Sequence, residues 1–247
     1  GRCINSSTLD VIDQYRSAVA HLQYVKGSSS FICSGGLLND TDASGFVPYL
    51  LTANHCFDSQ ASASTLEAFW NYFSSTCGGP PPSLGSLPKS NGSTLLATSP
   101  GSDFTLVRLL SVPSGRVFLG WNANASATSN NTLLHRLSHP SGYHQAYSRT
   151  KIVTSPAGTC TGLPTSGFIY STRQLGATLG GSSGAPVILA GGFVVGQLFG
   201  GCAQNPNEPC AFGSTDHFVD GRLSVTYPAI AQYLNPVTTG PCVQDAT

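Results

Sequence analysis

The sequence predicts an all-β protein, in which many short strands close into barrels or pack as a sandwich. Glycine occurs 28 times and proline 16 times in 247 residues, and both are spread between short β-branched and aromatic runs. This distribution is typical of short strands joined by turns. No segment repeats at a fixed period, which excludes propellers and solenoids. Long helical patterns are also missing.

The strands are expected in short apolar runs that are distributed along the whole chain. These runs are residues 18–22, 47–52, 68–73, 104–109, 168–170 and 193–198. Residues 78–95, which are dense in Gly, Pro and Ser, are expected to form an ordered but irregular loop. One helix is predicted near the C-terminus, where Ile230, Tyr233 and Leu234 recur at helical spacing before Asn235 and Pro236 end it.

The charge content excludes several classes of partner. Only 9% of the residues are charged, 11 Lys and Arg balance 11 Asp and Glu, and no run of like charges occurs. Binding of nucleic acid or of an anionic membrane surface requires concentrated positive charge, so neither partner is expected. No apolar stretch approaches the roughly 20 residues that span a bilayer, and we expect a soluble protein.

The cysteine content predicts an oxidising compartment. Eight Cys occur in a chain without Met, and disulfides persist in secreted proteins but are rare in the cytosol. Eight Cys allow about 105 pairings, so spacing alone assigns none of them. The chain begins at Gly1 without an initiator Met or a signal segment, and we expect a secreted, mature form from which a targeting sequence has been removed.

Three short segments contain residues suited to nucleophilic catalysis. The first includes His55, and a neutral imidazole is the best general base for a hydroxyl near neutral pH. The second places Asp103 at the start of an apolar strand, where orienting an imidazole N–H offsets the cost of burying a carboxylate. The third surrounds Ser183 with glycines, which allow backbone N–H groups to point at a developing oxyanion.

Each segment taken alone has a simpler interpretation. His55 could be a buried structural residue, Asp103 could be a turn residue that accepts hydrogen bonds from its own backbone, and the Gly/Ser segment around Ser183 could be a flexible turn. Their occurrence together in the chain order His, Asp, Ser favours catalysis, because this is the order of one class of serine peptidase.

Two of these segments resemble motifs of trypsin-like serine peptidases. Thr52-Ala53-Asn54-His55-Cys56 resembles their Thr-Ala-x-His-Cys motif, and residues 181–186 resemble their Gly-Asp-Ser-Gly-Gly-Pro motif with two changes. A more specific resemblance, from about residue 31 to 236, is to the bacterial lysyl endopeptidases. It rests on residues 70–72, 75–77, 102–106, 181–186 and 196–201.

The resemblance implies a chymotrypsin-like fold of two six-stranded antiparallel β-barrels with a short C-terminal helix. We expect the first barrel, which carries His55 and Asp103, within residues 1–118. The second barrel, with Ser183 and the specificity pocket, is expected within residues 119–247 together with the helix and tail.

The resemblance also implies the activity of a serine endopeptidase that hydrolyses protein or peptide substrates through an acyl-enzyme. His55 would be the general base, Asp103 would orient it, and Ser183 would attack the carbonyl, with the N–H groups of Gly181 and Ser183 as the oxyanion hole. We expect a monomer that needs no cofactor. The alternatives are a non-catalytic binding relative on the same fold and a different serine hydrolase, such as an esterase.

Ser182 departs from the trypsin-like motif, which has an Asp that pairs with a newly formed N-terminal ammonium. The chain also begins Gly-Arg-Cys and not Ile-Val-Gly-Gly, and lysyl endopeptidases share the Ser at this place. The two departures agree, so we expect an activity that does not depend on a buried N-terminal ion pair.

The substrate pocket is expected between three segments of the second half. Ala177 stands where trypsin has its selecting acid, so that route to basic specificity is absent. Lysyl endopeptidases take their acid from a later segment, which makes Asp216 the candidate here and Asp220 the alternative. In a third interpretation both are solvated turn residues.

The pocket acid would direct cleavage after Lys or Arg. The segment Leu198-Phe199-Gly200 is expected to lie along the substrate backbone beside the pocket. Phe199 replaces a His of the lysyl endopeptidases and instead favours apolar or aromatic side chains, so both specificities remain open.

For the cysteines, the resemblance implies a disulfide between Cys33 and Cys56, which ties the strand before the catalytic His to the residue after it. It also implies that Cys3 pairs with Cys202 or Cys210. No metal site is expected, because the chain contains no Cys-x-x-Cys pair and no His-Glu-x-x-His helix.

Overall fold

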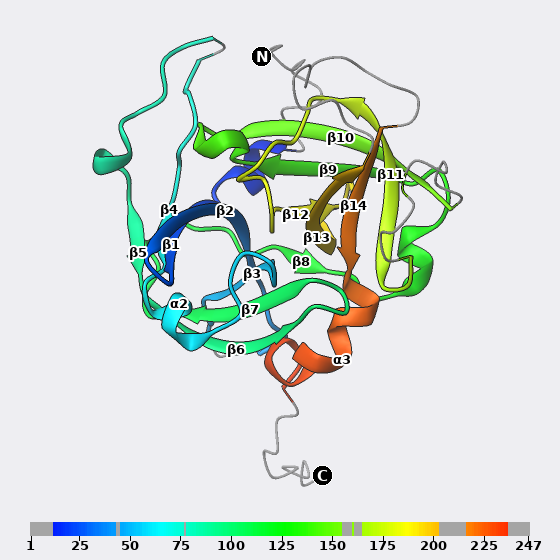
Figure 1. Cartoon of the computed structure of the whole chain (residues 1–247), viewed down its shortest axis with the longest axis horizontal. Coiled ribbons are helices and arrows are strands. Elements are labelled where there is room, and N and C mark those ends of the chain that lie inside the picture. The colour runs from blue at the N-terminus through cyan, green and yellow to red at the C-terminus, as the bar shows by residue number, and fades with distance from the viewer. Residues whose placement is uncertain are drawn as a thin grey trace, which may run out of the picture.

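The computed structural model describes residues 12–42, 45–76, 78–154, 160, 165–202 and 216–236. Two seven-stranded sheets, one from each half of the chain, make up most of this part of the molecule, and a helix follows the last strand (Figure 1). This arrangement confirms the prediction of an all-β fold with a short C-terminal helix. Among the described residues, no helix has the length and apolar character needed to cross a bilayer.

The first sheet is a curved half-barrel with the strand order β5-β4-β1-β2-β3-β7-β6. No ladder joins its edge strands β5 and β6, but these strands are consecutive and meet at Gly92, which has a φ of +71°. The chain itself therefore turns from one edge of the sheet to the other. The strands are β1 (Val19–Lys26), β2 (Ser29–Leu38), β3 (Tyr49–Ala53), β4 (Glu67–Phe69), β5 (Lys89–Asn91), β6 (Ser93–Ser99) and β7 (Phe104–Leu109).

The second sheet closes into a barrel. Six strands follow the order β12-β9-β10-β11-β14-β13, and β12 also pairs with β13, so the ladder is complete. β8 adds to β13 as a short parallel strand outside this ring. The strands are β8 (Gly120–Trp121), β9 (Leu133–Ser138), β10 (Ala146–Val153), β11 (Phe168–Leu175), β12 (Pro186–Ile188), β13 (Phe193–Cys202) and β14 (His217–Arg222).

The C-terminal helix α3 (Leu223–Leu234) packs both halves together. Its buried residues recur at helical spacing, and three of them, Leu223, Ile230 and Leu234, belong to one apolar cluster. The same cluster contains Leu106 from β7 and Val194 from β13. The helix therefore stabilises the junction between the two sheets as well as its own fold.

The expected irregular loop at residues 78–95 is more ordered than its composition indicates. It contains a 3-10 turn at Leu84–Ser86, the strand β5 and the start of β6. These segments are polar because they form sheet edges, where few side chains are buried, so the apolar pattern that identifies a strand is weak there. A second short helix, α2 (Gln60–Ser64), also lies outside the predicted elements.

The expected boundary between residues 118 and 119 remains a prediction. The strands of the two sheets separate in this region, since β7 ends at Leu109 and β8 begins at Gly120. Leu119 nevertheless exchanges backbone hydrogen bonds with the first half, donating to Leu37 O and accepting from Asn39 N. The two halves are thus connected by ladder contacts as well as by apolar packing.

Candidate active site

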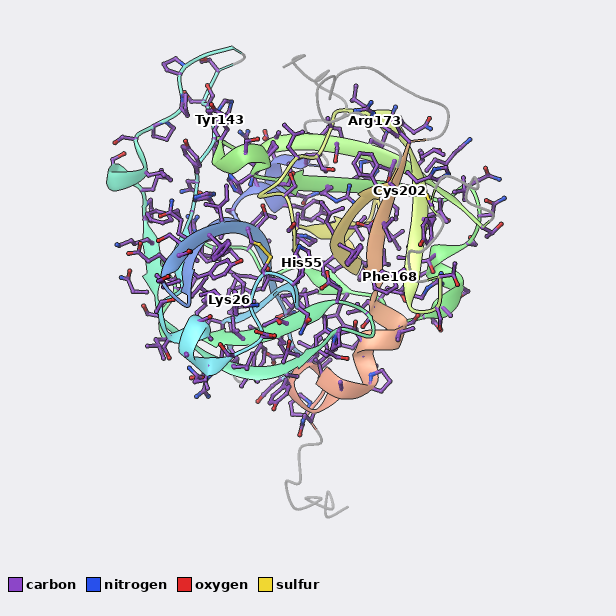
Figure 2. All side chains as sticks on the ribbon, in the orientation of Figure 1. Lys26, His55, Tyr143, Phe168, Arg173 and Cys202 are labelled. Carbon is purple, nitrogen blue, oxygen red and sulfur yellow. A yellow bond between two sulfur atoms is a disulfide. The ribbon has the colours of Figure 1, made fainter. Side chains whose placement is uncertain are left out.

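His55 and Asp103 lie together because β3 and β7 are paired neighbours in the first sheet, and the end of β3 lies opposite the start of β7. β3 ends at Ala53, which is paired with Phe104, the first residue of β7. His55 follows that end of β3, and Asp103 precedes that start of β7. Figure 2 shows His55 near the middle of the molecule, where the two sheets approach each other.

The Asp103 carboxylate contacts His55 through both of its oxygens. The distance from His55 Nδ1 to Asp103 Oδ2 is 2.8 Å, and the His55 backbone N–H donates to Oδ1 over 2.9 Å. Asp103 is buried, with 3% of its surface exposed, whereas 39% of the His55 side chain is exposed. Because a carboxylate only accepts hydrogen bonds, the contact places a proton on Nδ1 and leaves Nε2 as the acceptor in the neutral ring.

The backbone of Asp103 adopts a left-handed conformation, with a φ of +52°. Asp tolerates this region better than most residues, but at a cost. Two hydrogen bonds from Gln197 Nε2 in the second barrel support it, one to Ser102 O over 2.7 Å and one to Asp103 O over 3.1 Å. The second sheet therefore helps to hold the acid that orients His55.

The segment with Ser183 packs directly on the strand that leads to His55. The Ser34 N–H donates to Ser183 O over 2.8 Å. A Cβ atom on Gly184 would lie 2.2 Å from Thr52 Oγ1 and 2.8 Å from Ala53 N, so only glycine allows this approach. The chain thus brings Ser183, which is partly exposed, beside the segment that carries His55.

Gly181 has the conformation and surroundings that only glycine accepts. Its φ is +91°, and a Cβ atom there would lie 2.9 Å from His139 O. Its backbone therefore lies directly against the turn that follows β9.

Ser182 is completely buried and engaged in hydrogen bonds of its own. The Ser138 hydroxyl donates to the Ser182 hydroxyl over 3.1 Å, and the Leu179 N–H donates to it over 3.4 Å. The position that carries an Asp in trypsin-like enzymes is therefore filled by a neutral group with local partners. Residues 1–11, which include the N-terminal amine, lie outside the described residues.

The two candidate pocket acids are both buried and both lie against an arginine. Asp216 Oδ2 is 3.3 Å from Arg173 Nη2, and Asp220 pairs with Arg136, whose side chain is 1% exposed. Burial raises the pKa of Asp220, and Arg136 acts in the opposite direction. Neither acid has the exposed surroundings of a solvated turn residue.

The other residues expected around the substrate are Ala177 and three residues of β13, namely Leu198, Phe199 and Gly200. The Phe199 ring meets the His55 ring edge-on, with 5.7 Å between centroids. Leu198 is buried in an apolar cluster with Phe218, and a Cβ atom at Gly200 would meet nothing within 4 Å. Ala177 is partly buried.

The partners of these groups were not among the residues predicted from the sequence. Arg136, Arg173 and Phe218 carry no motif, and their contacts depend on the register of strands that are distant in the chain. No local signal in the sequence identifies them.

Comparison with known proteins identifies the family. Residues 2–219 match the family described as "Lysyl endopeptidase, C-terminal domain". The chain belongs to this family. A lysyl endopeptidase of Pseudomonas aeruginosa is 29% identical over 244 residues, which are 95% of this chain and 50% of that protein. The secreted RxLR effector protein 73 of Plasmopara viticola is 30% identical over 180 residues, 70% of this chain and 42% of that protein. The chain therefore spans about half the length of its lysyl endopeptidase relative.

Solved structures support the same fold. The Rv3671c protease of M. tuberculosis in its active form aligns with a TM-score of 0.60 and 16% identity, over 98% of this chain and 93% of that chain. The HtrA-type protease AlgW with a tripeptide aligns with a TM-score of 0.60 and 17% identity, over 91% of this chain and 62% of that chain. At this level of identity the likeness shows the fold alone.

This member of the lysyl endopeptidase family has two disulfides among the described residues. Cys33 pairs with Cys56, as the resemblance implied, and so links β2 to the residue after His55. Cys202 pairs with Cys160, so the expected pairing of Cys3 with Cys202 is wrong. The alternative partner, Cys210, lies outside the described residues.

One group of possible metal ligands occurs among the described residues. Cys160, Cys202 and His217 offer atoms within 4.8 Å of one another. The two sulfur atoms are joined in a disulfide, however, and only a thiolate is a good ligand. The disulfide therefore accounts for this group without an ion.

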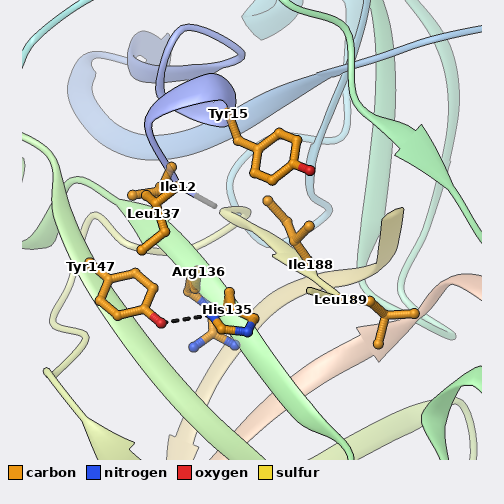
Figure 3. Close-up of a pocket in the computed structure, with 8 residues that line it drawn as sticks. All are labelled: Ile12, Tyr15, His135, Arg136, Leu137, Tyr147, Ile188 and Leu189. Atoms are coloured by element: carbon orange, nitrogen blue, oxygen red, sulfur yellow. Dashed lines mark hydrogen bonds between the residues drawn. The ribbon is translucent and has the colours of Figure 1, made fainter. Parts of the chain in front are cut away.

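A small cavity lies beside β9 and β12, and Arg136 of the Asp220 ion pair is among its lining residues. Figure 3 shows its wall, which includes the Tyr147 hydroxyl 2.7 Å from His135 Nδ1. Its volume is about 10 Å³, enough for about one water molecule, and its surface is almost entirely apolar. It is lined by Ile12, Tyr15, His135, Arg136, Leu137, Tyr147, Ile188 and Leu189. This cavity is a packing defect and not a substrate site.

Proposed function

We propose that the chain is a secreted serine endopeptidase that hydrolyses peptide bonds through a Ser183, His55 and Asp103 triad. The observation that carries the proposal is the pair of hydrogen bonds between His55 and a buried Asp103, beside a serine segment that packs on the same strand. Membership of the lysyl endopeptidase family supports the same activity.

In the proposed acylation step, His55 Nε2 removes the proton of the Ser183 hydroxyl as Ser183 Oγ attacks the carbonyl carbon of the substrate. The carbonyl oxygen becomes an oxyanion and accepts hydrogen bonds from the N–H groups of Gly181 and Ser183. His55 then gives its proton to the leaving amine, and the peptide bond breaks. Asp103 stays ionised and stabilises the imidazolium during this step.

In the deacylation step, His55 takes a proton from water, and the resulting hydroxide attacks the acyl-enzyme ester. Collapse of the second tetrahedral intermediate breaks the bond to Ser183 Oγ, and His55 returns the proton to that oxygen. The cycle needs no metal and no cofactor, because the protein supplies both proton transfer and oxyanion stabilisation.

For specificity, we propose cleavage after Lys or Arg, with Asp216 as the selecting acid. Asp216 precedes β14, whose first residue pairs with the end of β13. Both acids lie against an arginine, and Asp220 is the weaker candidate because it has no exposed surface, whereas 6% of Asp216 is exposed. Cleavage after apolar or aromatic residues is the second candidate, because Phe199 lies beside His55.

Casein digestion with the wild-type chain and with Ser183→Ala tests the activity. The wild type is expected to release peptides, and the variant is expected to lose at least a thousandfold of that rate, since it keeps only binding and oxyanion contacts. An unfolded variant is recognised by circular dichroism. A wild type that hydrolyses simple esters but no peptide bond would instead favour an esterase.

A panel of p-nitroanilide peptides that differ only in the residue before the scissile bond tests the specificity. Lys and Arg substrates are expected to be turned over fastest, and Asp216→Asn should remove that preference. A profile led by Phe, Tyr or Leu would reject Asp216 as the selecting acid and favour the second candidate.

A further inference from the structure

Ser34 is a completely buried residue of β2 that contacts the nucleophile segment through its side chain. Its hydroxyl donates a hydrogen bond to Gly181 O over 2.9 Å and accepts one from the His139 N–H over 3.0 Å. One hydroxyl proton therefore satisfies one acceptor, and the oxygen satisfies one donor. No sequence motif singled out this residue.

These contacts determine the orientation of the peptide plane on the C-terminal side of Gly181. The plane on its N-terminal side is determined by a hydrogen bond of 2.6 Å from the Ser141 N–H to Gly180 O. Since a trans peptide directs its N–H opposite to its C=O, holding Gly180 O on one side directs the Gly181 N–H to the other side. Both planes that meet at Gly181 are thus held from outside the segment.

The main chain of Ser34 adds a second connection between the site's parts. Its N–H donates to Ser183 O, and its carbonyl accepts from the Thr52 hydroxyl over 2.8 Å. Thr52 belongs to β3 and lies three residues before His55 in the chain. Ser34 therefore joins the carbonyls on both sides of Ser182 to the strand that positions the general base.

We propose that Ser34 is a positioning residue for the oxyanion hole, which acts by holding the Gly181 and Ser183 carbonyls so that the backbone between them keeps the N–H groups of Gly181 and Ser183 directed at the reacting carbonyl. This inference rests on the proposed function, since it assigns a role within the same site. Gly181 has no Cβ and occupies a region that glycine enters and leaves easily, so its peptide planes need external hydrogen bonds to stay in one orientation.

The test compares Ser34→Ala with the wild type and with Ser90→Ala. Ser90 is a serine of the first sheet that is buried to the same degree. It accepts a hydrogen bond of 3.0 Å from Trp70 Nε1, which is not part of the nucleophile segment. Both variants leave buried groups without a partner, so their melting temperatures are expected to fall by similar amounts. A third variant, Ser34→Thr, keeps the hydroxyl.

Each variant is assayed with the preferred p-nitroanilide and with diisopropyl fluorophosphate, whose phosphoryl oxygen also needs the oxyanion hole. Removal of a whole oxyanion donor lowers kcat by about 10²–10³-fold, so we expect a loss of about tenfold to a hundredfold when a donor is only misdirected. For Ser34→Ala, KM should stay within about twofold, and the inactivation rate should fall by the same factor as kcat. Ser90→Ala should retain the wild-type kcat, and Ser34→Thr should recover most of it.

The proposal is overturned if folded Ser34→Ala keeps its kcat, or if its loss lies in KM alone. It is also overturned if Ser34→Thr is as slow as Ser34→Ala, because the hydroxyl is then not the group that matters. Failure of Ser34→Ala to fold while Ser90→Ala folds would assign Ser34 to stability alone. If the wild type itself neither cleaves the substrate nor reacts with the reagent, the proposed function fails instead.

Discussion

The Asp103 carboxylate accepts hydrogen bonds from both the backbone N–H and the ring Nδ1 of His55, and so determines which ring nitrogen carries the proton. An Asn at this position keeps the size and the backbone contact but presents an NH₂ group as well as a carbonyl oxygen. If the NH₂ group faces the ring, Nδ1 becomes the acceptor and the proton moves to Nε2. The ring is then unable to accept the proton of Ser183.

For Asp103→Asn we therefore expect kcat on a peptide anilide to fall by roughly a thousandfold or more with little change in stability. Asp58→Asn is the matched control, because Asp58 forms an exposed ion pair with Lys26 in the same half of the chain. The role of Asp103 as the orienting acid is rejected if both variants keep the wild-type kcat.

At the residue scale, the sequence indicated the groups that we propose for the chemistry but not the groups that hold them. His55, Asp103 and Ser183 stand in short motifs whose residue types follow from the reaction. Ser34 is 147 residues from its partner Gly181, and Arg136 is 84 residues from Asp220. Contacts of that kind depend on strand register and packing, which a single sequence does not reveal.

At the scale of elements, the C-terminal helix is a structural link between the two sheets. Ile230 is completely buried in the cluster that also contains residues of β7, β12 and β13. Its replacement by Ala leaves a cavity between the halves, and core Ile→Ala changes cost about 2–5 kcal/mol. We expect the free energy of unfolding of Ile230→Ala, measured with urea, to fall by about this amount.

Val225→Ala on the same helix is the control, since 49% of Val225 is exposed. It should change the free energy of unfolding by less than about 0.5 kcal/mol, as surface changes usually do. Equal losses in the two variants would contradict this role of the buried junction, because Ala raises helix propensity at both positions.

The elements that the sequence predicted well are those with a buried apolar side. β7 and α3 appear where the apolar pattern places them, because burial of one face produces the periodicity. β5 and the start of β6 were expected as part of a loop, since edge strands with polar residues lack that pattern. The turn at Gly92 that joins them is visible only when their pairing with β4 and β7 is known.

At the scale of the whole molecule, three histidines gather where the first sheet meets the turn after β9. His21 on β1 lies 5.4 Å from His139 between ring centroids, Tyr72 stacks on His139, and His144 follows on the same turn. Burial lowers the pKa of His21 to about 4 and that of His139 to about 3, the latter with a further contribution from His21. Both rings are therefore neutral in the folded protein near neutral pH.

These histidines make the fold sensitive to acid. The folded pKa values lie below the unfolded value of about 6.5. At pH values between the folded and unfolded pKa, the unfolded chain therefore binds more protons than the folded protein, and the free energy of unfolding decreases as the pH is lowered. The stability is complete above about pH 6.5 and is lost as the pH approaches the folded pKa values. For His21 alone the loss between pH 7.5 and 5 is about 2 kcal/mol.

Urea unfolding at pH 7.5 and pH 5 measures this loss. His21→Gln, which does not titrate, is expected to make the free energy of unfolding less dependent on pH than it is in the wild type. A pH dependence that is the same in the wild type and in His21→Gln would contradict the account.

The central claim, that Ser183 is a nucleophile activated by His55, is tested most directly by mapping the site of reaction with diisopropyl fluorophosphate. Mass spectrometry of peptides from the labelled wild type is expected to find one adduct, on Ser183, and His55→Ala is expected to react at a small fraction of the wild-type rate. An adduct on another residue, or none on correctly folded wild-type protein, would contradict the claim.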